Sequence, residues 1–175
     1  MPPLKRILLV EDDPHDIDLT FTALEECHLA NEIVVARDGV EALDYLHGRG
    51  MFAARPDGNP ALILLDLKMP RLGGLQVLKA LKTNEMMRLI PVVILSSSRE
   101  ERDLTECYAL GVNSYVVKPV RFTEFVEAVT GIGIFWALIN EPPPGSLKKE
   151  GGLGLRRLER KAFDGTASPH SASGR

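Results

Sequence analysis

Short apolar runs alternate with amphipathic segments along the first 140 residues of the chain. The first run, residues 5–10, is basic at its start, continuously apolar afterwards, and ends abruptly at an acidic triplet. A strand buried on both faces of a parallel sheet has this pattern. Pro14 then stands where the first turn of a helix tolerates proline, and apolar residues recur behind it at helical spacing. These helical positions are Ile17, Phe21, Leu24 and His28.

The same alternation continues to about residue 140. We expect further strands at residues 32–36, 61–66, 91–95 and 114–117, and further helices near residues 39–46, 75–81, 99–110 and 121–140. Glycine, proline and polar residues mark 48–60 as a long loop. Strands that alternate with helices favour right-handed βαβ units. The sequence therefore predicts an α/β fold whose parallel sheet is covered by helices on both faces.

The composition changes beyond Glu141. Pro142, Pro143, Pro144 and Gly145 cannot continue a helix, and glycine, serine and charged residues dominate afterwards. We therefore expect one domain over residues 1–140 and an irregular, largely flexible extension over 141–175. A short amphipathic helix in this extension remains an alternative. It would use Leu153, Leu155, Leu158 and Phe163.

Charge and cysteine content narrow the class of protein. Residues 141–175 hold seven basic and four acidic side chains, whereas residues 1–140 hold 14 and 20, so the body is acidic. An acidic body argues against nucleic-acid binding. No signal peptide is recognisable, and no apolar run approaches the roughly 20 residues that cross a bilayer. Cys27 and Cys107, both placed in predicted helices, are too few for a disulfide framework, so we expect a cytoplasmic protein without membrane contact.

Polar side chains follow the ends of four of the five predicted strands at the edge where doubly wound sheets carry their sites. They are Glu11, Asp12 and Asp13 after the first strand, Asp66 after the third, Ser96 after the fourth and Lys118 after the fifth. Carboxylates gathered in one crevice repel each other unless a cation neutralises them, and oxygen ligands of this kind suit Mg²⁺.

This set of residues can perform one reaction. A carboxylate can attack phosphorus and form an aspartyl phosphate, while a metal ion and a lysine share the charge of the phosphoryl oxygens. Ser96 offers a neutral donor to one of these oxygens. Taken singly, each residue has an ordinary interpretation: a capping or turn acid, a loop serine, a surface lysine. Their joint occurrence at the strand ends favours phosphoryl chemistry at Asp66.

Five blocks resemble the receiver domain of two-component response regulators over residues 4–140. They are KRILLVED at 5–12, LILLDLKMP at 62–70, GGLQVL at 73–78, PVVILSSS at 91–98 and GVNSYVVKP at 111–119. The resemblance implies a flavodoxin-like, five-stranded parallel sheet in the order 2-1-3-4-5. It also implies a signalling protein that catalyses only its own phosphorylation and dephosphorylation, rather than a turnover enzyme.

The resemblance also assigns roles to individual residues. It implies that Glu11 and Asp12 bind Mg²⁺ together with Asp66 and the backbone carbonyl of Lys68. It implies that Asp66 accepts the phosphoryl group and that Lys118 contacts this group. It also implies that Ser96 and Tyr115 form the switch and that the Lys118–Pro119 bond is cis. Asp13, one place beyond the acidic pair, is not expected to be a ligand. Glutamate at position 11, where the family has aspartate, would lengthen the metal contact.

Softer features are similar to the small receivers that are paired with phytochrome-type sensor kinases. They are EDDPHDIDLT at 11–20, the loop at 48–60 and the pair Phe135–Trp136. We therefore expect a single-domain response regulator without an output domain, phosphorylated by a sensor histidine kinase. The rival hypotheses are a phosphorylation-independent interaction module and a flavin or nucleotide binder. The intact acids, Ser96 and Lys118 argue against the first, and the acids after the first strand would repel the second's ligand.

The last predicted helix is apolar around more than one face, including Phe135 and Trp136. One interpretation is a helix packed under the tail. The interpretation we favour is a homodimer interface on the segments 99–110, 114–117 and 121–140, because exposed apolar patches often mark contacts.

Overall fold

A computed structural model describes residues 5–29 and 33–146. The strands are β1 (Ile7–Val10), β2 (Ile33–Ala36), β3 (Leu62–Leu65), β4 (Val92–Ser96) and β5 (Ser114–Val117). The helices are α1 (Pro14–Glu25), α2 (Gly39–His47), α3 (Gly74–Thr83), α4 (Glu101–Ala109) and α5 (Phe122–Gly133), with a 3₁₀ turn, η2 (Gly50–Phe52), and a π-helical segment, η3 (Ile134–Ile139).

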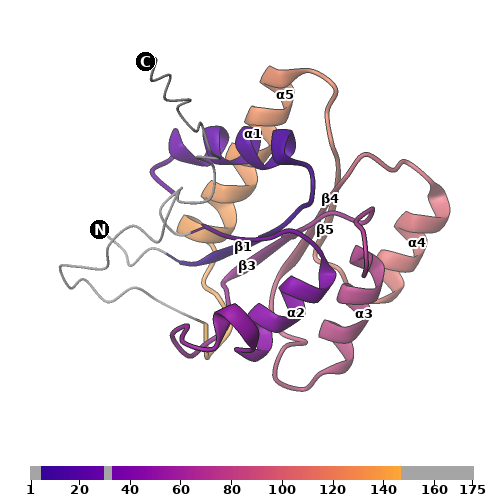
Figure 1. Ribbon diagram of the computed structural model, residues 1–175. Helices are drawn as coiled ribbons and strands as arrows, with labels where there is room; N and C mark the ends of the chain where they lie inside the picture. Colours follow the sequence, from indigo (N-terminus) through magenta and orange to yellow (C-terminus); the bar gives the residue numbers. More distant parts are fainter. Residues whose placement is uncertain (1–4, 30–32, 147–175) are drawn as a thin grey trace, which may run out of the picture.

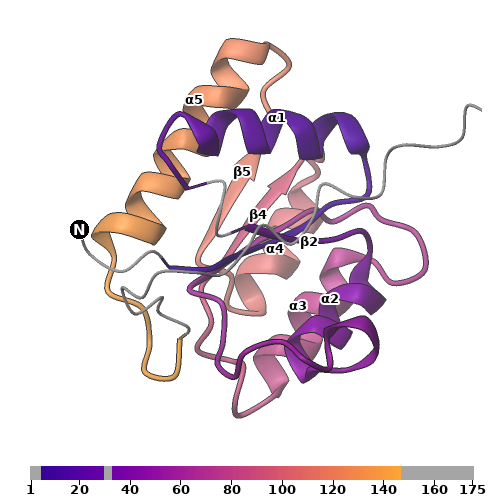
Figure 2. The same cartoon turned by 60° about the vertical axis from the view of Figure 1, so that its left-hand side comes forward.

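All neighbouring strands pair in parallel, in the order β2-β1-β3-β4-β5. This confirms the α/β fold and the flavodoxin-like order 2-1-3-4-5. Helices α1 and α5 cover one face of the sheet, and α2, α3 and α4 cover the other (Figures 1 and 2). Because both faces of the sheet are covered, every residue of β1, β3 and β4 is buried, and all of these residues except Ser96 at the end of β4 are apolar.

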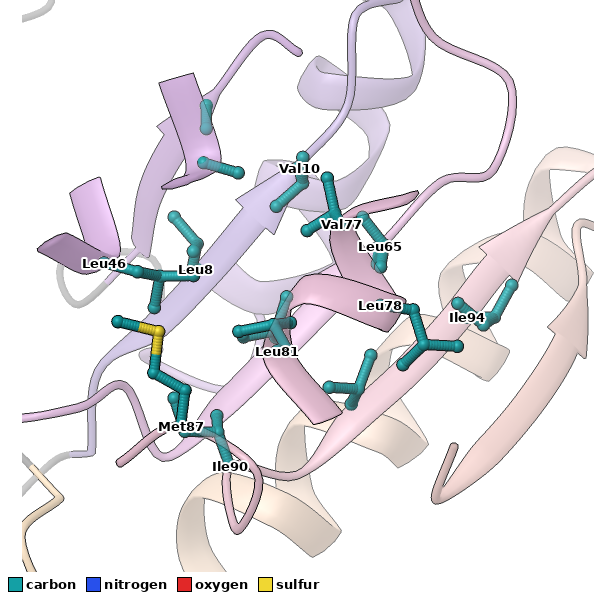
Figure 3. Close-up of a cluster of buried hydrophobic side chains, with 14 of the residues drawn as sticks. Leu8, Val10, Leu46, Leu65, Val77, Leu78, Leu81, Met87, Ile90 and Ile94 are labelled. Carbon is teal, nitrogen blue, oxygen red and sulfur yellow. The ribbon is translucent and has the colours of Figure 1, made fainter. Parts of the chain in front are cut away.

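Successive residues of a strand point to opposite faces of the sheet and pack into two separate hydrophobic cores. Leu8 and Val10 of β1 pack into the cluster that includes Val77 and Leu78 of α3 (Figure 3). The intervening Ile7 and Leu9 point to the opposite cluster, which α1 and α5 cover. Because each fully buried aliphatic side chain contributes roughly 1.5–3 kcal/mol, the two cores together hold the strand ends in place.

The first helix ends earlier than its apolar spacing predicted. Helix α1 stops at Glu25, and His28 lies beyond it with φ +59°, so its assignment to the helix was wrong. Cys27, also expected in a helix, lies in this turn. Leu29 is fully buried, and its amide donates to the carbonyl of Leu24 over 2.8 Å. The apolar anchor after the turn is therefore Leu29 rather than residue 28.

The last helix is α-helical only as far as Gly133. The chain then widens into η3, and the amide of Asn140 donates to the carbonyl of Phe135, five residues earlier, over 2.7 Å. Glycine is a weak helix former, so Gly131 and Gly133 allow this change of winding. Gly133 also sits against α1, because a Cβ there would lie 2.4 Å from the Leu24 side chain.

The segment Phe122–Ile139 is long and apolar enough to cross a membrane by length and composition alone. The expectation that no apolar run approaches a membrane span was therefore too strict. The sequence test missed it because Glu124 and Glu127 interrupt the apolar run. In the structure Phe125 and Val129 of this segment are buried in the core under α1. Only 28% of the segment is buried, which leaves an apolar face on the surface.

Residues 140–146 return to the edge of the sheet where the strands begin. Lys5, buried just before β1, donates its ammonium to the carbonyl of Asn140. The amide of Asn59, shortly before β3, donates to Gly145 over 2.9 Å, and Asn59 forms an isolated bridge with Ser146. The first residues beyond 140 therefore pack on the domain. The alternative helix at residues 153–163 lies outside the described residues.

Candidate functional site

The sheet ladder carries the functional residues to one edge. Beyond the last strand residues, the amide of Glu11 donates to Ala36 and that of Asp66 donates to Val10, both over 3.0 Å. The amide of Lys118 likewise donates to the carbonyl of Ser96 over 2.8 Å. Each predicted residue thus extends a strand by one ladder bond, and the shared register brings their side chains together.

Three carboxylates form an acidic cluster at this edge. Oxygen atoms of Glu11, Asp12 and Asp66 all lie within 4.8 Å of one another. Glu11 and Asp66 are buried, being 3% and 7% exposed, whereas Asp12 is half-buried. An all-oxygen donor set with this spacing and excess negative charge fits a hard divalent cation such as Mg²⁺.

Lys118 lies among the carboxylates rather than in solvent. Its Nζ donates to Glu11 and to Asp16, each over 2.7 Å, and lies 3.5 Å from Oδ2 of Asp66. Burial alone would lower the pKa of Lys118, but the hydrogen bonds to Asp16 and Glu11 and the charge of Asp66 raise it overall. The ammonium is therefore permanently charged near neutral pH. Burial also raises the pKa of Glu11, an effect that Lys118 only partly opposes.

Asp16 is a site residue that the sequence did not single out. It lies in the first turn of α1. An acidic residue at this position usually only stabilises the helix, through its interaction with the positive end of the helix dipole. Its proximity to the acidic triplet is the only signal that could have indicated it. Asp13 is the N-cap of α1 and accepts the amide of His15 over 2.8 Å, while its exclusion from the ligands stays a prediction.

The backbone after Asp66 is held tightly. Oδ1 of Asp66 accepts the amide of Leu67 over 2.7 Å, and the amide of Gly74 returns to the Leu67 carbonyl over 3.0 Å. A Cβ at Gly74 would lie 2.0 Å from the carbonyl oxygen of Asp66, so only glycine allows this approach. The side chain of Lys68 is exposed and lies 3.9 Å from Glu100, while the role of its carbonyl as a metal ligand stays a prediction.

A second network links Ser96 to Tyr115. The fully buried Ser96 accepts the amide of Ser98 through its hydroxyl oxygen over 3.3 Å. The Tyr115 hydroxyl donates to the Ser98 carbonyl over 3.0 Å, and the Ser98 hydroxyl donates to Asp103 over 2.5 Å. Burial raises the pKa of Tyr115. Ser98 thus connects the two predicted switch residues, and Asp103 holds the Ser98 side chain. Neither Ser98 nor Asp103 was singled out from the sequence.

The Lys118–Pro119 bond is not cis, contrary to what the resemblance implied: the described residues contain no cis peptide bond. The trans isomer is the lower-energy state of X–Pro bonds by about 0.5–1 kcal/mol. Lys118 reaches the acidic cluster with this bond in the trans form.

Phe135 and Trp136 lie in η3 and contact each other edge to face, with centroids 5.2 Å apart. Phe135 is 48% exposed, whereas Trp136 packs partly against the core under α1. They are thus unequal candidates for a surface contact. Other large apolar side chains of η3 are exposed as well, namely Ile134, Leu138 and Ile139.

Comparison with known proteins gives one consistent family. The family model described as "Response regulator receiver domain" matches residues 7–130. The response regulator Rcp1 of Synechocystis sp. is 38% identical over 134 residues, which cover 77% of this chain and 90% of Rcp1. A solved structure of Rcp1 is described as its Mn²⁺-bound form; it has 37% identity and a TM-score of 0.74, covering 79% of this chain and 99% of that one.

Two further solved structures support this grouping. The phosphorylated cyanobacterial phytochrome response regulator RcpA is 39% identical, with a TM-score of 0.75 over 80% of this chain and 99% of its own. The bacteriophytochrome response regulator RtBRR is 59% identical, with a TM-score of 0.65 over 82% of this chain and 86% of its own. With its receiver fold and its cluster of Glu11, Asp12 and Asp66, this chain belongs to the response regulator receiver family and is homologous to phytochrome response regulators.

Proposed function

We propose that the protein is a cytoplasmic single-domain response regulator that accepts a phosphoryl group on Asp66 from a sensor histidine kinase. One observation supports this proposal most strongly: the buried carboxylate of Asp66 lies within 4.8 Å of two further acids and 3.5 Å from the ammonium of Lys118. An aspartate with a purely structural role would not require two neighbouring carboxylates and a buried lysine. Burying several like charges is unfavourable unless the site binds a cation or reacts.

The residues divide the work of phosphoryl transfer. The Asp66 carboxylate attacks the phosphorus of a phosphohistidine, and the histidine leaves with the bonding electron pair. Lys118 moves its contact from Asp66 to a phosphoryl oxygen, and the Ser96 hydroxyl donates to another. Glu11, Asp12, Asp66 and the carbonyl of Lys68 would hold Mg²⁺. When bound, Mg²⁺ supplies the positive charge that phosphoryl oxygens require in the transition state.

Phosphorylation would then act through the network that starts at Ser96. Movement of Ser96 toward the phosphoryl group would disturb its bond with the Ser98 amide, and the Ser98 carbonyl holds the Tyr115 hydroxyl. The surface of α4, β5 and α5 would respond because Tyr115 belongs to β5 and Asp103 to α4. Such two-state elements are the usual output of receiver switches.

The test is incubation with acetyl phosphate and Mg²⁺, followed by intact-mass measurement. We expect a gain of one phosphoryl group that Asp66→Asn abolishes and EDTA prevents. Asp57→Asn changes an exposed loop aspartate and serves as the matched control, which should label like the wild type. No mass gain, or a gain that survives Asp66→Asn, would favour the rival interaction module that works without phosphorylation.

The partner we propose is a phytochrome-type sensor histidine kinase. The support comes from relatives, since RcpA is described as a phytochrome response regulator and RtBRR as a bacteriophytochrome response regulator. A phosphotransfer screen with purified kinases should give fastest labelling of Asp66 from a kinase of this type. Equal or faster transfer from unrelated kinases would contradict the assignment. For residues 141–175 of this sequence we propose no output domain.

We also propose a homodimer through the α4–β5–α5 face, extended by η3. The exposed Phe135 and Tyr108 supply apolar area on this face. Size-exclusion chromatography with light scattering should give a dimer for the wild type and a monomer for Phe135→Glu. Met51→Glu, in η2 and away from this face, is the control and should remain dimeric. A wild-type monomer at micromolar concentration would refute the dimer without affecting the phosphorylation proposal.

A further inference from the structure

The loop between Asp66 and α3, residues 67–73, is fastened to the start of α2 by an ion pair outside the acidic cluster. Asp38 is buried, and its Oδ1 accepts the amides of Val40 and Glu41 over 2.8 and 2.9 Å as the N-cap of α2. Its Oδ2 accepts Nε of Arg71 over 2.6 Å and is also contacted by Nη2. One carboxylate thus both caps a helix and holds the loop.

The electrostatics of Asp38 favour this double role. Burial alone would raise the pKa of Asp38, but the backbone donor of Glu41 and the guanidinium of Arg71 lower it overall. The carboxylate therefore stays ionised near neutral pH. A two-donor contact from arginine to one carboxylate also fixes direction more firmly than a lysine contact would.

Arg71 itself has an unusual backbone. Its φ is +60°, a conformation that residues with a Cβ seldom adopt unless their surroundings impose it. The next residue is fixed as well, because the Leu72 carbonyl accepts the amide of Gly39 over 3.1 Å. A Cβ at Gly39 would lie 2.4 Å from that carbonyl oxygen, so the two backbones are in direct contact. Helices α2 and α3 accordingly lie side by side on the same face of the sheet (Figures 1 and 2).

The other end of the loop is fixed at the phosphoacceptor. Leu67 donates to Asp66 and accepts from Gly74, as described above. Only residues 68–70 lie between this anchor and Arg71. They include Lys68, whose carbonyl is the predicted metal ligand. A chain of three residues held at both ends has little freedom to move that carbonyl, so loosening Arg71 would reduce the order of the metal site.

We propose that Asp38 and Arg71 are positioning residues that set the affinity of the acidic cluster for its divalent cation. The proposal rests on the proposed Mg²⁺ site, and it assigns to these residues an effect on binding rather than on the chemical step. Arg71 is the cleaner residue to change because its side chain is 56% exposed, so its loss removes little packing. Asp38→Asn retains an oxygen for the α2 cap while removing the charge that holds Arg71.

The experiment is calorimetric titration of the full chain with Mg²⁺ alone, together with rates of labelling by acetyl phosphate. For Arg71→Ala we expect the Kd for Mg²⁺ to rise about tenfold, the lower end of the roughly 10–100-fold loss that follows removal of partners that orient metal ligands. The labelling rate should fall by the same factor at low Mg²⁺ and recover at saturating Mg²⁺. Arg71→Lys, which keeps the charge without the two-donor contact, should give an intermediate Kd, and Asp38→Asn should resemble Arg71→Ala.

Arg121→Ala is the matched control, because Arg121 is also an exposed, ion-paired arginine but lies outside this loop, with Glu124 at 3.4 Å. Its Kd should equal that of the wild type. Urea unfolding without Mg²⁺ should give a lower midpoint for Arg71→Ala than for the wild type, but Arg71→Ala should still unfold cooperatively, because Asp38 keeps its two backbone donors as the cap of α2. An unchanged Kd in Arg71→Ala, or an equal rise in Arg121→Ala, overturns the inference. A wild type that binds no Mg²⁺ would instead overturn the proposed function.

Discussion

Replacing Lys118 by alanine removes the only ammonium that the described residues place within the acidic cluster. In the wild type its Nζ lies 2.7 Å from Glu11 and Asp16 and 3.5 Å from Asp66. Glu11 and Asp66 have little access to water, with side chains 3% and 9% exposed. Without Lys118 these carboxylates would face each other and Asp12 with no cationic side chain among them.

The expected loss of stability follows from this burial. Removing one partner of a buried ion pair costs about 3–5 kcal/mol, because the remaining charge is left uncompensated. Asp16 is 23% exposed, and protonation of one of the carboxylates can relieve part of their repulsion. We therefore expect a loss of stability at the lower end of this range, about 3 kcal/mol. The free energy of unfolding of a native protein is about 5–15 kcal/mol, so the loss expected for Lys118→Ala is a large fraction of the whole stability. Because stability falls by about 1–3 kcal/mol for each molar of urea, the unfolding midpoint should fall by roughly 1–3 M.

Urea unfolding near neutral pH, in EDTA and in millimolar Mg²⁺, measures this effect. Mg²⁺ should stabilise Lys118→Ala more than it stabilises the wild type, since the cation supplies the charge that the lysine no longer does. Lys68→Ala is the control for stability, because its exposed pair with Glu100 is worth at most about 1 kcal/mol. The reasoning is wrong if Lys118→Ala in EDTA is as stable as Lys68→Ala, or if Mg²⁺ stabilises both equally.

Two further predictions concern packing and cysteine reactivity. Gly133→Ala should lower the free energy of unfolding by about 1–3 kcal/mol, because the added Cβ overlaps the side chain of Leu24. Gly131→Ala has open space around it and should raise the free energy of unfolding by about 0.5–1 kcal/mol. Equal urea midpoints for the two variants would contradict this packing. Burial raises the pKa of Cys107 from 9.0 to about 11, so below pH 9 only the half-buried Cys27 should react with a thiol reagent in the folded protein. Urea should expose Cys107 as the second reactive thiol. Rapid reaction of two thiols in the folded protein would contradict this prediction. Because the folded state keeps the Cys107 proton more tightly than the unfolded state, this contribution to stability is complete below about pH 9 and is lost as the pH rises toward 11.

The fold and the central site residues could be predicted from the sequence for one physical reason. Each buried parallel strand is a short apolar run, and the polar residue that ends it must emerge at the same edge as its neighbours'. Glu11, Asp66 and Lys118 are of this kind, and the structure places all three within one cluster. Their position depends on the sheet ladder alone, which the sequence pattern reveals.

Residues that depend on loop and helix geometry could not be found in this way. Asp16 reaches Lys118 because α1 begins shortly after the end of β1. Asp38 meets Arg71 through a loop in which Arg71 has a positive φ. Neither contact leaves a periodic signal in the sequence. The same holds for His28, since apolar spacing cannot tell where a helix stops and a turn begins.

The contact of Asn59 with Gly145 and Ser146 has a practical consequence for handling the protein. The described chain ends at the edge of the sheet where the strands begin, whereas Asp66 lies at the edge where they finish. A linker fused directly after Ser146 would therefore leave the molecule on the side away from Asp66. Molecules tethered to a sensor surface through such a linker would present Asp66 to the solution, so kinase encounters could be timed without obstruction by the support.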